Sequence, residues 1–195
     1  QAQLDKKAHI AAKLYLKPGM KVLDIGCGWG GMALYLHEKY GVEVLGVTLS
    51  EEQIKIAKAR AEAAGVADKV KFQLIDYRDI DGKFDRIVSV GMFEHVGTPQ
   101  YPVFFKKCRE LLTDEGVMLI HTIGRMGPPG VTDTFTLKYI FPGGYIPALS
   151  EMIQGSEGTR LMVTDVEVLR MHYGLTIREW YKRTMAHKAD IVALY

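Results

Sequence analysis

The stretch VLDIGCGWGG, residues 22–31, constrains the fold of this chain more than any other. Hydrophobic residues lead into Asp24, a glycine-dense turn follows at once, and the next residues, MALYLHEKY, have the pattern of a helix. A buried strand that ends in a glycine turn and opens a helix places backbone N–H groups and a positive helix end beside a bound ligand. The stretch therefore predicts a nucleotide-binding type of α/β fold.

The glycine spacing matches two classes of cofactor site. Gly26, Gly28 and Gly30 give the G-x-G-x-G spacing of folds that hold S-adenosylmethionine (SAM), whereas Gly26, Gly28 and Gly31 match the dinucleotide fingerprint G-x-G-x-x-G. Asp24 decides between them, because an acid just before the turn suits the cationic ammonium of a methionine better than a pyrophosphate. SAM is the working hypothesis from these residues.

Strands and helices alternate through the first two thirds of the chain. Strands are expected at residues 21–25, 42–50, 69–76, 84–91 and 116–124, and helices at residues 1–16, 32–40, 51–64 and 101–112. This rhythm predicts right-handed βαβ units and hence an α/β fold: a doubly wound, mostly parallel sheet with helices on both faces.

The alternation fails after residue 124. Residues 125–147 are rich in glycine, proline and aromatic residues, and a stretch of this length without clear elements more often shapes a binding site than merely connects two elements. The alternative is a structural excursion or a surface insertion. A short helix is expected at 150–154, a strand at 159–168 and a final helix at 175–195. We predict a single domain over residues 1–195 with a substrate-pocket insertion at about 125–158, and without the strand that usually closes such a sheet.

Composition excludes several classes of protein. The 195 residues are 48% hydrophobic and 25% charged with a net charge of +2, and no basic stripe points to nucleic acid. Cys27 and Cys108 give neither a disulfide framework nor a metal-ligand cluster, so no metal is expected and a reducing cytosol fits. No apolar run approaches the roughly 20 residues of a membrane-spanning helix, and the opening residues do not have the pattern of a signal peptide.

Polar residues follow the second and third expected strands, where an open α/β sheet binds its ligand. Thr48 and Gln53 could contact the ribose and the amino-acid part of SAM, although Ser50 and Gln53 also form a helix capping pattern. Asp76 could accept a hydrogen bond from the adenine amine while Tyr77 stacks on the ring. The alternative for the last pair is a solvated surface turn.

Glu94 and His121 follow the fourth and fifth strands, at the same edge of the sheet. Titratable groups that share a ligand edge are candidates for acid–base work. A lone histidine on an apolar strand is more often a hydrogen-bonded core residue, and this caution applies to His95 as well. Glu94, His95 and His121 lack a recognisable metal-ligand spacing.

At these residues the chain closely resembles the cyclopropane-fatty-acyl-phospholipid synthases and the related mycolic acid cyclopropane synthases. The resemblance runs almost end to end, through LKPGMKVLDIGCGWGG, GVTLS-EEQ, QLIDYRD, FDRIVSVGMFEHVG, LIHTIG, KYIFPGGYIP and HYGLTIREW. The glycine turn is common to many methyltransferases, whereas FEHVG followed by HTIG and YIFPGGYIP is far more specific. The resemblance implies a class I SAM-dependent methyltransferase fold.

The resemblance also implies the site residues. In that family a bicarbonate ion lies next to the methyl carbon, and its binding residues match Glu94, His121, the backbone beside Ile123, and Tyr173. The cofactor pocket carries over to the glycine turn, to the end of the second strand and to the end of the third. With Asp24, the expected cofactor contacts are Gly26, Cys27, Gly28, Trp29, Gly30, Thr48, Leu49, Ser50, Gln53, Asp76 and Tyr77.

The implied reaction transfers a methylene from SAM to the cis double bond of an unsaturated phospholipid acyl chain. Methyl transfer leaves a carbocation, which bound bicarbonate deprotonates to close a cyclopropane ring. An aromatic wall would keep water out, with Phe93, Tyr139, Phe141 and Tyr145 as candidates and core packing as their alternative role. His121 is expected to supply positive character near neutral pH.

Such an enzyme would be cytoplasmic and associate peripherally with the inner membrane surface, without binding nucleic acid. Lysines of the opening helix could contact anionic lipid, although ordinary packing is the commoner role of such a helix. Two alternatives remain: a SAM-dependent N- or C-methyltransferase of a small metabolite, and a fragment that binds SAM without turnover. The family's segment with a Tyr-Ser pair at the cofactor and the helices over the acyl channel find no match in these residues. The sequence does not indicate the oligomeric state.

Overall fold

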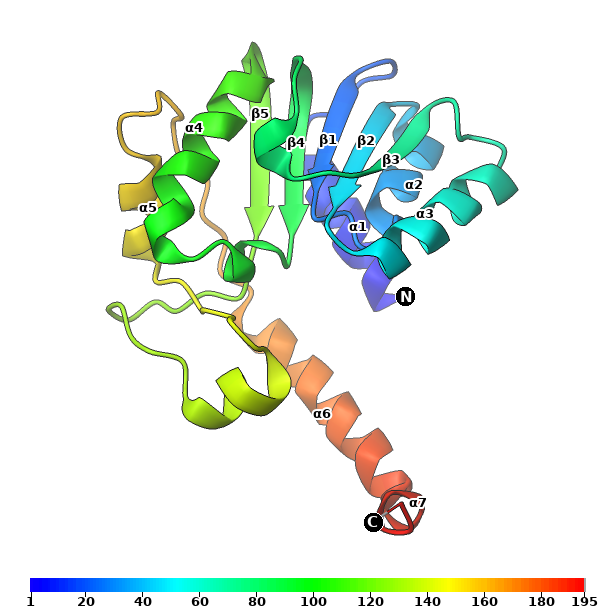
Figure 1. Cartoon of the computed structure of the whole chain (residues 1–195), viewed down its shortest axis with the longest axis vertical. Helices are drawn as coiled ribbons and strands as arrows, with labels where there is room; N and C mark the ends of the chain where they lie inside the picture. The colour runs from blue at the N-terminus through cyan, green and yellow to red at the C-terminus, as the bar shows by residue number, and fades with distance from the viewer. Residues whose placement is uncertain (195) are drawn as a thin grey trace. The chain divides into compact units, whose positions relative to one another are not determined.

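The computed structural model describes residues 1–194 and divides into two compact units, residues 1–161 and 162–195. The first unit holds a sheet of five parallel strands in the order β3-β2-β1-β4-β5 (Figure 1). The strands are β1 (Lys21–Ile25), β2 (Glu43–Thr48), β3 (Val70–Leu74), β4 (Phe84–Val90) and β5 (Leu112–His121). The predicted doubly wound α/β sheet is confirmed, with the strand before the glycine turn at its centre.

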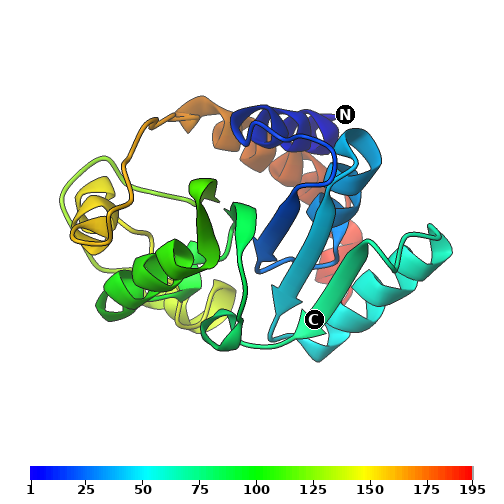
Figure 2. The ribbon, with the colours of Figure 1, turned by 90° about the horizontal axis from the view of Figure 1, so that it is seen from above.

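Helices cover both faces of this sheet, as Figure 2 shows from above. The helices of the first unit are α1 (Ala2–Lys13), α2 (Gly31–Tyr40), α3 (Glu51–Ala63), α4 (Tyr101–Leu111) and α5 (Leu149–Ser156). Buried residues of α1, α2 and α3 form one hydrophobic core, and those of α4 form the core on the opposite face. Alternate residues of β1 divide between the two, with Val22 in the first and Leu23 in the second.

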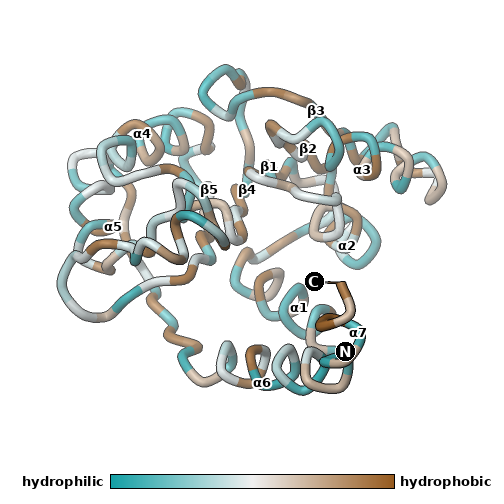
Figure 3. Tube along the Cα trace, turned by 60° about the horizontal axis from the view of Figure 1, so that its bottom comes forward, coloured by the Kyte–Doolittle hydropathy of each residue, from teal (hydrophilic) through white to brown (hydrophobic). Residues whose placement is uncertain are grey.

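The helix α4 illustrates why these residues fold as they do. Its buried side chains recur at helical spacing, so one face enters the core while the other meets solvent; hydrophobic and hydrophilic residues both occur along it in Figure 3. These buried residues are Tyr101, Phe104, Phe105, Cys108 and Leu111.

One irregularity lies at the amino-terminal end of β5. Phe84 pairs with Leu112 and Arg86 with Val117, so β5 bulges outward between these two pairs. From Arg86 onward the pairing is regular up to Val90 and His121. The strand ends that face the candidate site are therefore in normal parallel register.

Short helical turns and the insertion follow the sheet. They are η1 (Tyr77–Asp79), η2 (Phe93–His95), η3 (Thr98–Gln100) and η4 (Thr136–Ile140). The insertion expected at about 125–158 contains η4 and α5, and an isolated parallel bridge joins Arg125 to Ala148. Its role as a substrate pocket stays a prediction, as does the single domain over residues 1–195.

The second unit, described by itself, contains α6 (Arg170–Ala186) and α7 (Lys188–Val192). The strand predicted at 159–168 is wrong, because residues 161–169 form neither strand nor helix and the apolar side chains Met162, Val163, Val166 and Val168 are exposed. Their alternation resembles a strand, yet within residues 1–194 no strand pairs with it. The predicted final helix begins earlier than expected, at Arg170, and its last residue, Tyr195, lies outside the described residues.

Candidate active site

The glycine turn after β1 is fixed against the neighbouring strand end. The N–H groups of Gly26 and Cys27 both donate to the carbonyl oxygen of Val47, at 2.9 and 3.0 Å. Gly26 has φ +79°, and a Cβ added there would lie 2.6 Å from Cγ of Met92. The chain needs glycine at this position for both its backbone conformation and its close approach to Met92.

Asp24 lies in the interior of β1, directly before this turn. Its side chain is 2% exposed and its Oδ2 atom has no hydrogen-bond partner. Burial raises the pKa of Asp24 to about 7. A buried carboxyl with one oxygen unpartnered within residues 1–194, beside a turn of backbone N–H groups, fits the cationic ammonium of a methionine moiety.

The other turn residues differ in exposure. Cys27 is buried, and burial followed by the charge of Asp24 raises the pKa of its thiol to about 12. Trp29 and Leu49, by contrast, expose about half or more of their side chains. The buried thiol is therefore no nucleophile, while the two exposed apolar side chains could cover a ligand.

The end of β2 carries a small hydrogen-bonded cluster. The Ser50 hydroxyl accepts from the N–H of Gln53 at 3.3 Å, which confirms the predicted helix cap. The Gln53 side chain turns instead to Thr48, whose hydroxyl donates to Oε1 at 3.0 Å. The cluster fixes the Gln53 side chain, and its contact with the ribose or the methionine stays a prediction.

The end of β3 places Asp76 and Tyr77 beside other residues of the protein. The Asp76 carboxylate accepts from the Arg78 guanidinium at 2.9 and 2.7 Å, and this hydrogen bond is the main cause of its lowered pKa. Tyr77 is partly buried and packs edge-on against Phe104 with ring centroids 5.3 Å apart. Their predicted adenine contacts are not tested by this arrangement.

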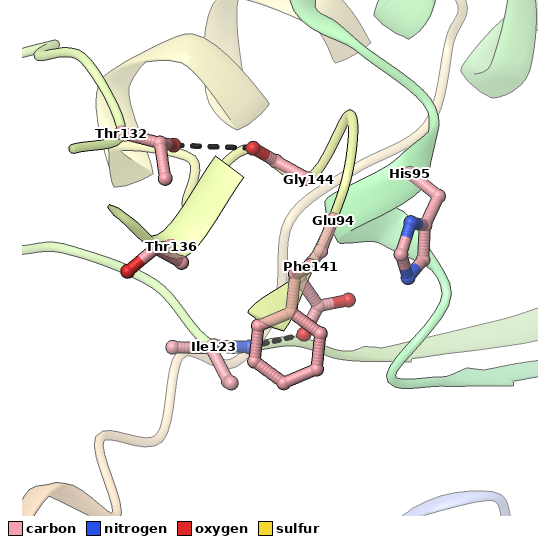
Figure 4. Close-up of a pocket in the computed structure, with 7 residues that line it drawn as sticks. All are labelled: Glu94, His95, Ile123, Thr132, Thr136, Phe141 and Gly144. Carbon is pink, nitrogen blue, oxygen red and sulfur yellow. Dashed lines mark hydrogen bonds between the residues drawn. The ribbon is translucent and has the colours of Figure 1, made fainter. Parts of the chain in front are cut away.

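Glu94 and Ile123 lie together, as predicted. The N–H of Ile123 donates to Oε1 of Glu94 at 2.8 Å, and the carbonyl oxygen of Glu94 accepts from the N–H of Tyr145 at 2.9 Å. Figure 4 shows the Glu94 carboxylate beside the N–H of Ile123 and the Phe141 ring. These residues line a cavity of about 80 Å³. The lining residues are Glu94, His95, Ile123, Thr132, Thr136, Phe141 and Gly144.

His121 ends β5 next to the end of β4, where it pairs with Val90. Burial is the main cause that lowers the pKa of His121 below 6.5, and the charge of Lys6 adds to it while Glu94 opposes it. The imidazole is therefore mainly neutral near pH 7, and the predicted positive character is wrong. The sequence pattern gave no indication of how deeply this strand end is buried.

Two polar atoms at this edge lack partners. Oε2 of Glu94 and Nδ1 of His121 are both buried without a hydrogen bond. Buried polar atoms in native proteins are nearly always satisfied, by protein groups or by a bound molecule. An acceptor and an imidazole nitrogen at one strand edge fit a small polar molecule that can both donate and accept, as bicarbonate can.

Tyr173 lies on α6 in the second unit. Its ring contacts the Trp180 ring edge-on, with centroids 6.2 Å apart, and its side chain is partly exposed. Its predicted place at the bicarbonate stays a prediction.

The structure revises the aromatic wall. Phe93 is fully buried and stacks on Tyr101 with ring centroids 4.3 Å apart. The prediction that it lines the aromatic wall is therefore wrong, and it packs in the core instead. Phe141 lines the cavity, whereas Tyr139 pairs with Phe135 on an exposed turn. Sequence reasoning missed Thr132 and Thr136, which lie inside the glycine- and proline-rich stretch but belong to no motif.

Within residues 1–194, no group of histidine, cysteine and acidic side chains is placed to hold a metal ion. No helix in this part of the chain is long and apolar enough to cross a membrane.

Comparisons with known proteins agree on one family. The family model described as mycolic acid cyclopropane synthetase matches residues 1–195. Cyclopropane-fatty-acyl-phospholipid synthase of Escherichia coli is 44% identical over 194 residues, which cover 100% of this chain and 50% of that protein. Cyclopropane mycolic acid synthase 1 of Mycobacterium tuberculosis is 36% identical, with 100% of this chain and 72% of that protein covered.

A solved structure agrees with these sequences. The mycolic acid cyclopropane synthase CmaA1, complexed with SAH and CTAB, superposes with a TM-score of 0.89 and 34% identity, covering 100% of this chain and 73% of that chain. The fold is thus that of the class I SAM-dependent methyltransferases. The chain spans about half the length of the E. coli relative.

Proposed function

Because the chain belongs to the mycolic acid cyclopropane synthetase family, we propose that it forms the catalytic part of a SAM-dependent enzyme that builds a cyclopropane ring on an unsaturated acyl chain. The observation that carries the proposal is the pair of unpartnered buried atoms on Glu94 and His121, at the strand edge where the glycine turn would hold SAM. A methyltransferase that acts on an amine would not need these two unpartnered polar atoms beside an apolar cavity.

The cofactor side of the proposal rests on Asp24 and the glycine turn. The buried carboxyl of Asp24 would hold the ammonium of SAM, and Thr48 and Gln53 would contact its sugar or amino acid. SAM supplies an electrophilic methyl group when it is bound. The relative whose solved structure contains SAH, the product left after methyl transfer, supports this choice of cofactor.

The acceptor side must solve a harder chemical problem, because an isolated alkene is a poor nucleophile. It needs the double bond held in line with the methyl group in a dry site, and Phe141 at the cavity would exclude water there. A base must then remove one proton from the transferred carbon, so that the acyl chain gains one CH2 overall.

We assign that base to bicarbonate held by Glu94, His121 and the segment of Ile123. Glu94 is already fixed by the Ile123 N–H, and the neutral His121 can donate or accept through Nδ1. An anion beside a carboxylate is repulsive unless the two share a proton, and the O–H of bicarbonate could donate that proton to a carboxylate oxygen.

The proposed substrate is the cis-unsaturated acyl chain of a phospholipid, encountered by a cytoplasmic protein at the membrane surface. The name of the E. coli relative includes a phospholipid, and the CmaA1 complex contains CTAB, a long-chain amphiphile. Both observations support an acyl acceptor over a small soluble metabolite.

One experiment separates this proposal from its alternatives. The protein is incubated with labelled SAM and vesicles of unsaturated phospholipid, and the acyl chains are analysed by mass spectrometry. A gain of one CH2 with loss of alkene reactivity supports cyclopropanation, whereas a gain of CH2 with the alkene retained indicates a methyl-branching enzyme. Label on a soluble amine, or SAM binding without any transfer, would overturn the proposal.

A further inference from the structure

We propose that Tyr145 and Glu151 form a positioning pair that holds Glu94 in its working geometry, an inference that rests on the proposed function of Glu94. Neither side chain lines the cavity, so they act through Glu94 and its backbone rather than on the reacting atoms.

The first step is the link from Glu151 to Tyr145. The Tyr145 hydroxyl donates to the Glu151 carboxylate, with 2.9 Å to Oε1 and 2.8 Å to Oε2. The same carboxylate accepts from the N–H of Ala148 at 2.8 Å, at the start of α5. A charged acceptor shared by a phenol and a backbone N–H is a strong tether, so Tyr145 is fixed to the amino-terminal turn of α5.

The second step is the link from Tyr145 to Glu94. The N–H of Tyr145 donates to the carbonyl oxygen of Glu94, and the N–H of Ile123 donates to its carboxylate. The segments that contain these two donors are themselves joined, because Arg125 and Ala148 form a parallel bridge. The backbone N–H of Arg125 donates to the carbonyl oxygen of Pro147 at 2.9 Å, and its side-chain Nε donates to the carbonyl oxygen of Ile146 at 3.1 Å.

These bonds close a ring around Glu94. The ring runs from the Glu94 carboxylate through Ile123 and the bridge at Arg125 to Tyr145, and back to the Glu94 carbonyl. The Arg125 guanidinium also lies over the Tyr145 ring, 5.9 Å from its centroid. The carboxylate and the backbone of Glu94 are thus held by one connected segment.

The third step is the anchoring of Glu151. Helix α5 lies close against α4, since a Cβ on Gly155 would come within 2.7 Å of Cβ of Tyr101. Tyr101 in turn stacks on Phe93, the residue before Glu94. Its buried hydroxyl has no hydrogen-bond partner within residues 1–194, and burial is the main cause that raises its pKa, with further contributions from Glu151, Tyr145 and Glu94.

Loss of a hydrogen bond in this closed network around Glu94 should lower the rate of the chemical step more than it weakens the binding of SAM. SAM is proposed to bind at the glycine turn, to which none of the hydrogen bonds described above leads, whereas small displacements of a positioned group lower the rate of the chemical step. We therefore expect Glu151→Ala and Tyr145→Phe to lower kcat by about 10-fold and to leave KM for SAM within about 2-fold, in line with the cost of misplaced groups.

The test compares these two variants with Glu151→Gln and with two matched controls. Glutamine keeps an oxygen that can accept from Ala148 and an amide that can donate to the Tyr145 hydroxyl, so it should restore most of the rate. The controls make the same chemical changes at exposed positions, Glu157→Gln at the end of α5 and Tyr15→Phe after α1. The controls should behave as the unaltered protein.

Two further measurements distinguish positioning from a general loss of stability. A titration with bicarbonate in depleted buffer should show a higher half-saturating concentration for Glu151→Ala, and added bicarbonate should recover part of its rate. Amide hydrogen exchange should accelerate at Tyr145 and Ile123 in Glu151→Ala, while the amides of β1 stay protected.

The exchange measurement is independent of turnover, so it separates the two proposals. Faster exchange at Ile123 supports the positioning pair even if the unaltered protein forms no cyclopropane, in which case the proposed function alone fails. Unchanged exchange at both amides, or a Glu151→Ala variant with unaltered kcat in an active enzyme, overturns the positioning pair.

Discussion

The two halves of the candidate site are built in different ways. The cofactor half, around the glycine turn, combines backbone hydrogen bonds to Val47 with close packing, because Gly26 lies against Met92 and Asp24 is enclosed within β1. The acceptor half, around Glu94, is held by hydrogen bonds from the insertion and from the segment after β5. The first half should therefore respond to changes of volume, and the second to changes of single polar groups.

The largest expected effect is a loss of turnover caused by a change in the acceptor half alone. Glu94→Gln keeps the shape of the side chain but removes its charge, so turnover should fall by about 100- to 1,000-fold, the usual cost of losing a key electrostatic group. SAM affinity, measured by calorimetry, should stay within about 3-fold because the glycine turn is unaltered. Equal losses of turnover and SAM binding would contradict the division into halves.

The next effect tests whether packing governs the cofactor half. Gly26→Ala should destabilise the protein by about 3 kcal/mol, since it combines a strained backbone with a Cβ forced against Met92. Gly65 is a matched control with φ +67° and no atom within 4 Å of an added Cβ, so Gly65→Ala should cost only about 1 kcal/mol. Urea denaturation of both variants measures the difference, and equal losses would show that packing at Met92 is unimportant.

A third effect concerns the buried charge of the cofactor half. Asp24 has a folded pKa of about 7 against an ordinary value of 3.8, so the folded state binds more protons between these two values and the free energy of unfolding falls as pH rises. Without SAM, this loss should be on the order of 2 kcal/mol between pH 5 and pH 7, at about 1.4 kcal/mol per pKa unit. Asp24→Asn should remove this slope in denaturation experiments.

Binding of SAM should lower the raised pKa of Asp24. An ammonium beside Asp24 favours the ionised carboxyl, so SAM binding near pH 6 should release a proton, which calorimetry in buffers of different ionisation enthalpy detects. Absence of proton release, with binding intact, would place the ammonium away from Asp24.

The smallest expected effect is the pH dependence of stability that His121 causes in the acceptor half. The folded pKa of His121 is lowered, so the neutral form is favoured by folding and stability is lost as pH falls through the ordinary value of 6.5. His121→Gln should lessen that acid sensitivity between pH 7.5 and pH 5.5, because glutamine does not titrate. Denaturation at the two pH values checks it, and a steeper acid dependence in the variant would reverse the assigned sign.

The contrast also explains which features could be predicted from the sequence. The strands and the cofactor half depend on local patterns, so β1, the Ser50 cap and the parallel, doubly wound sheet follow from hydrophobic periodicity, turn residues and the alternation of strands with helices. The meeting of Glu94 and Ile123 was predicted from the family resemblance, on motifs at two neighbouring strand ends.

The remaining features depend on contacts that no local pattern records. The alternation at 159–168 needs a partner strand to become a strand, and the burial of Phe93 depends on where α4 packs. Tyr145 meets Glu151 at the start of α5, inside the irregular insertion, where no regular period predicts which side chains meet. The neutral His121 likewise follows from burial, which the sequence around it does not reveal.

The bulge at the start of β5 has a practical consequence. Between Leu112 and Val117 the strand departs from the register of β4, yet it returns to register before His121. The extra residues of β5 at its amino-terminal end therefore leave the register unchanged at its carboxyl-terminal end, where His121 lies. A fluorescent label placed at the exposed residue Asp114 should therefore report on folding without disturbing turnover.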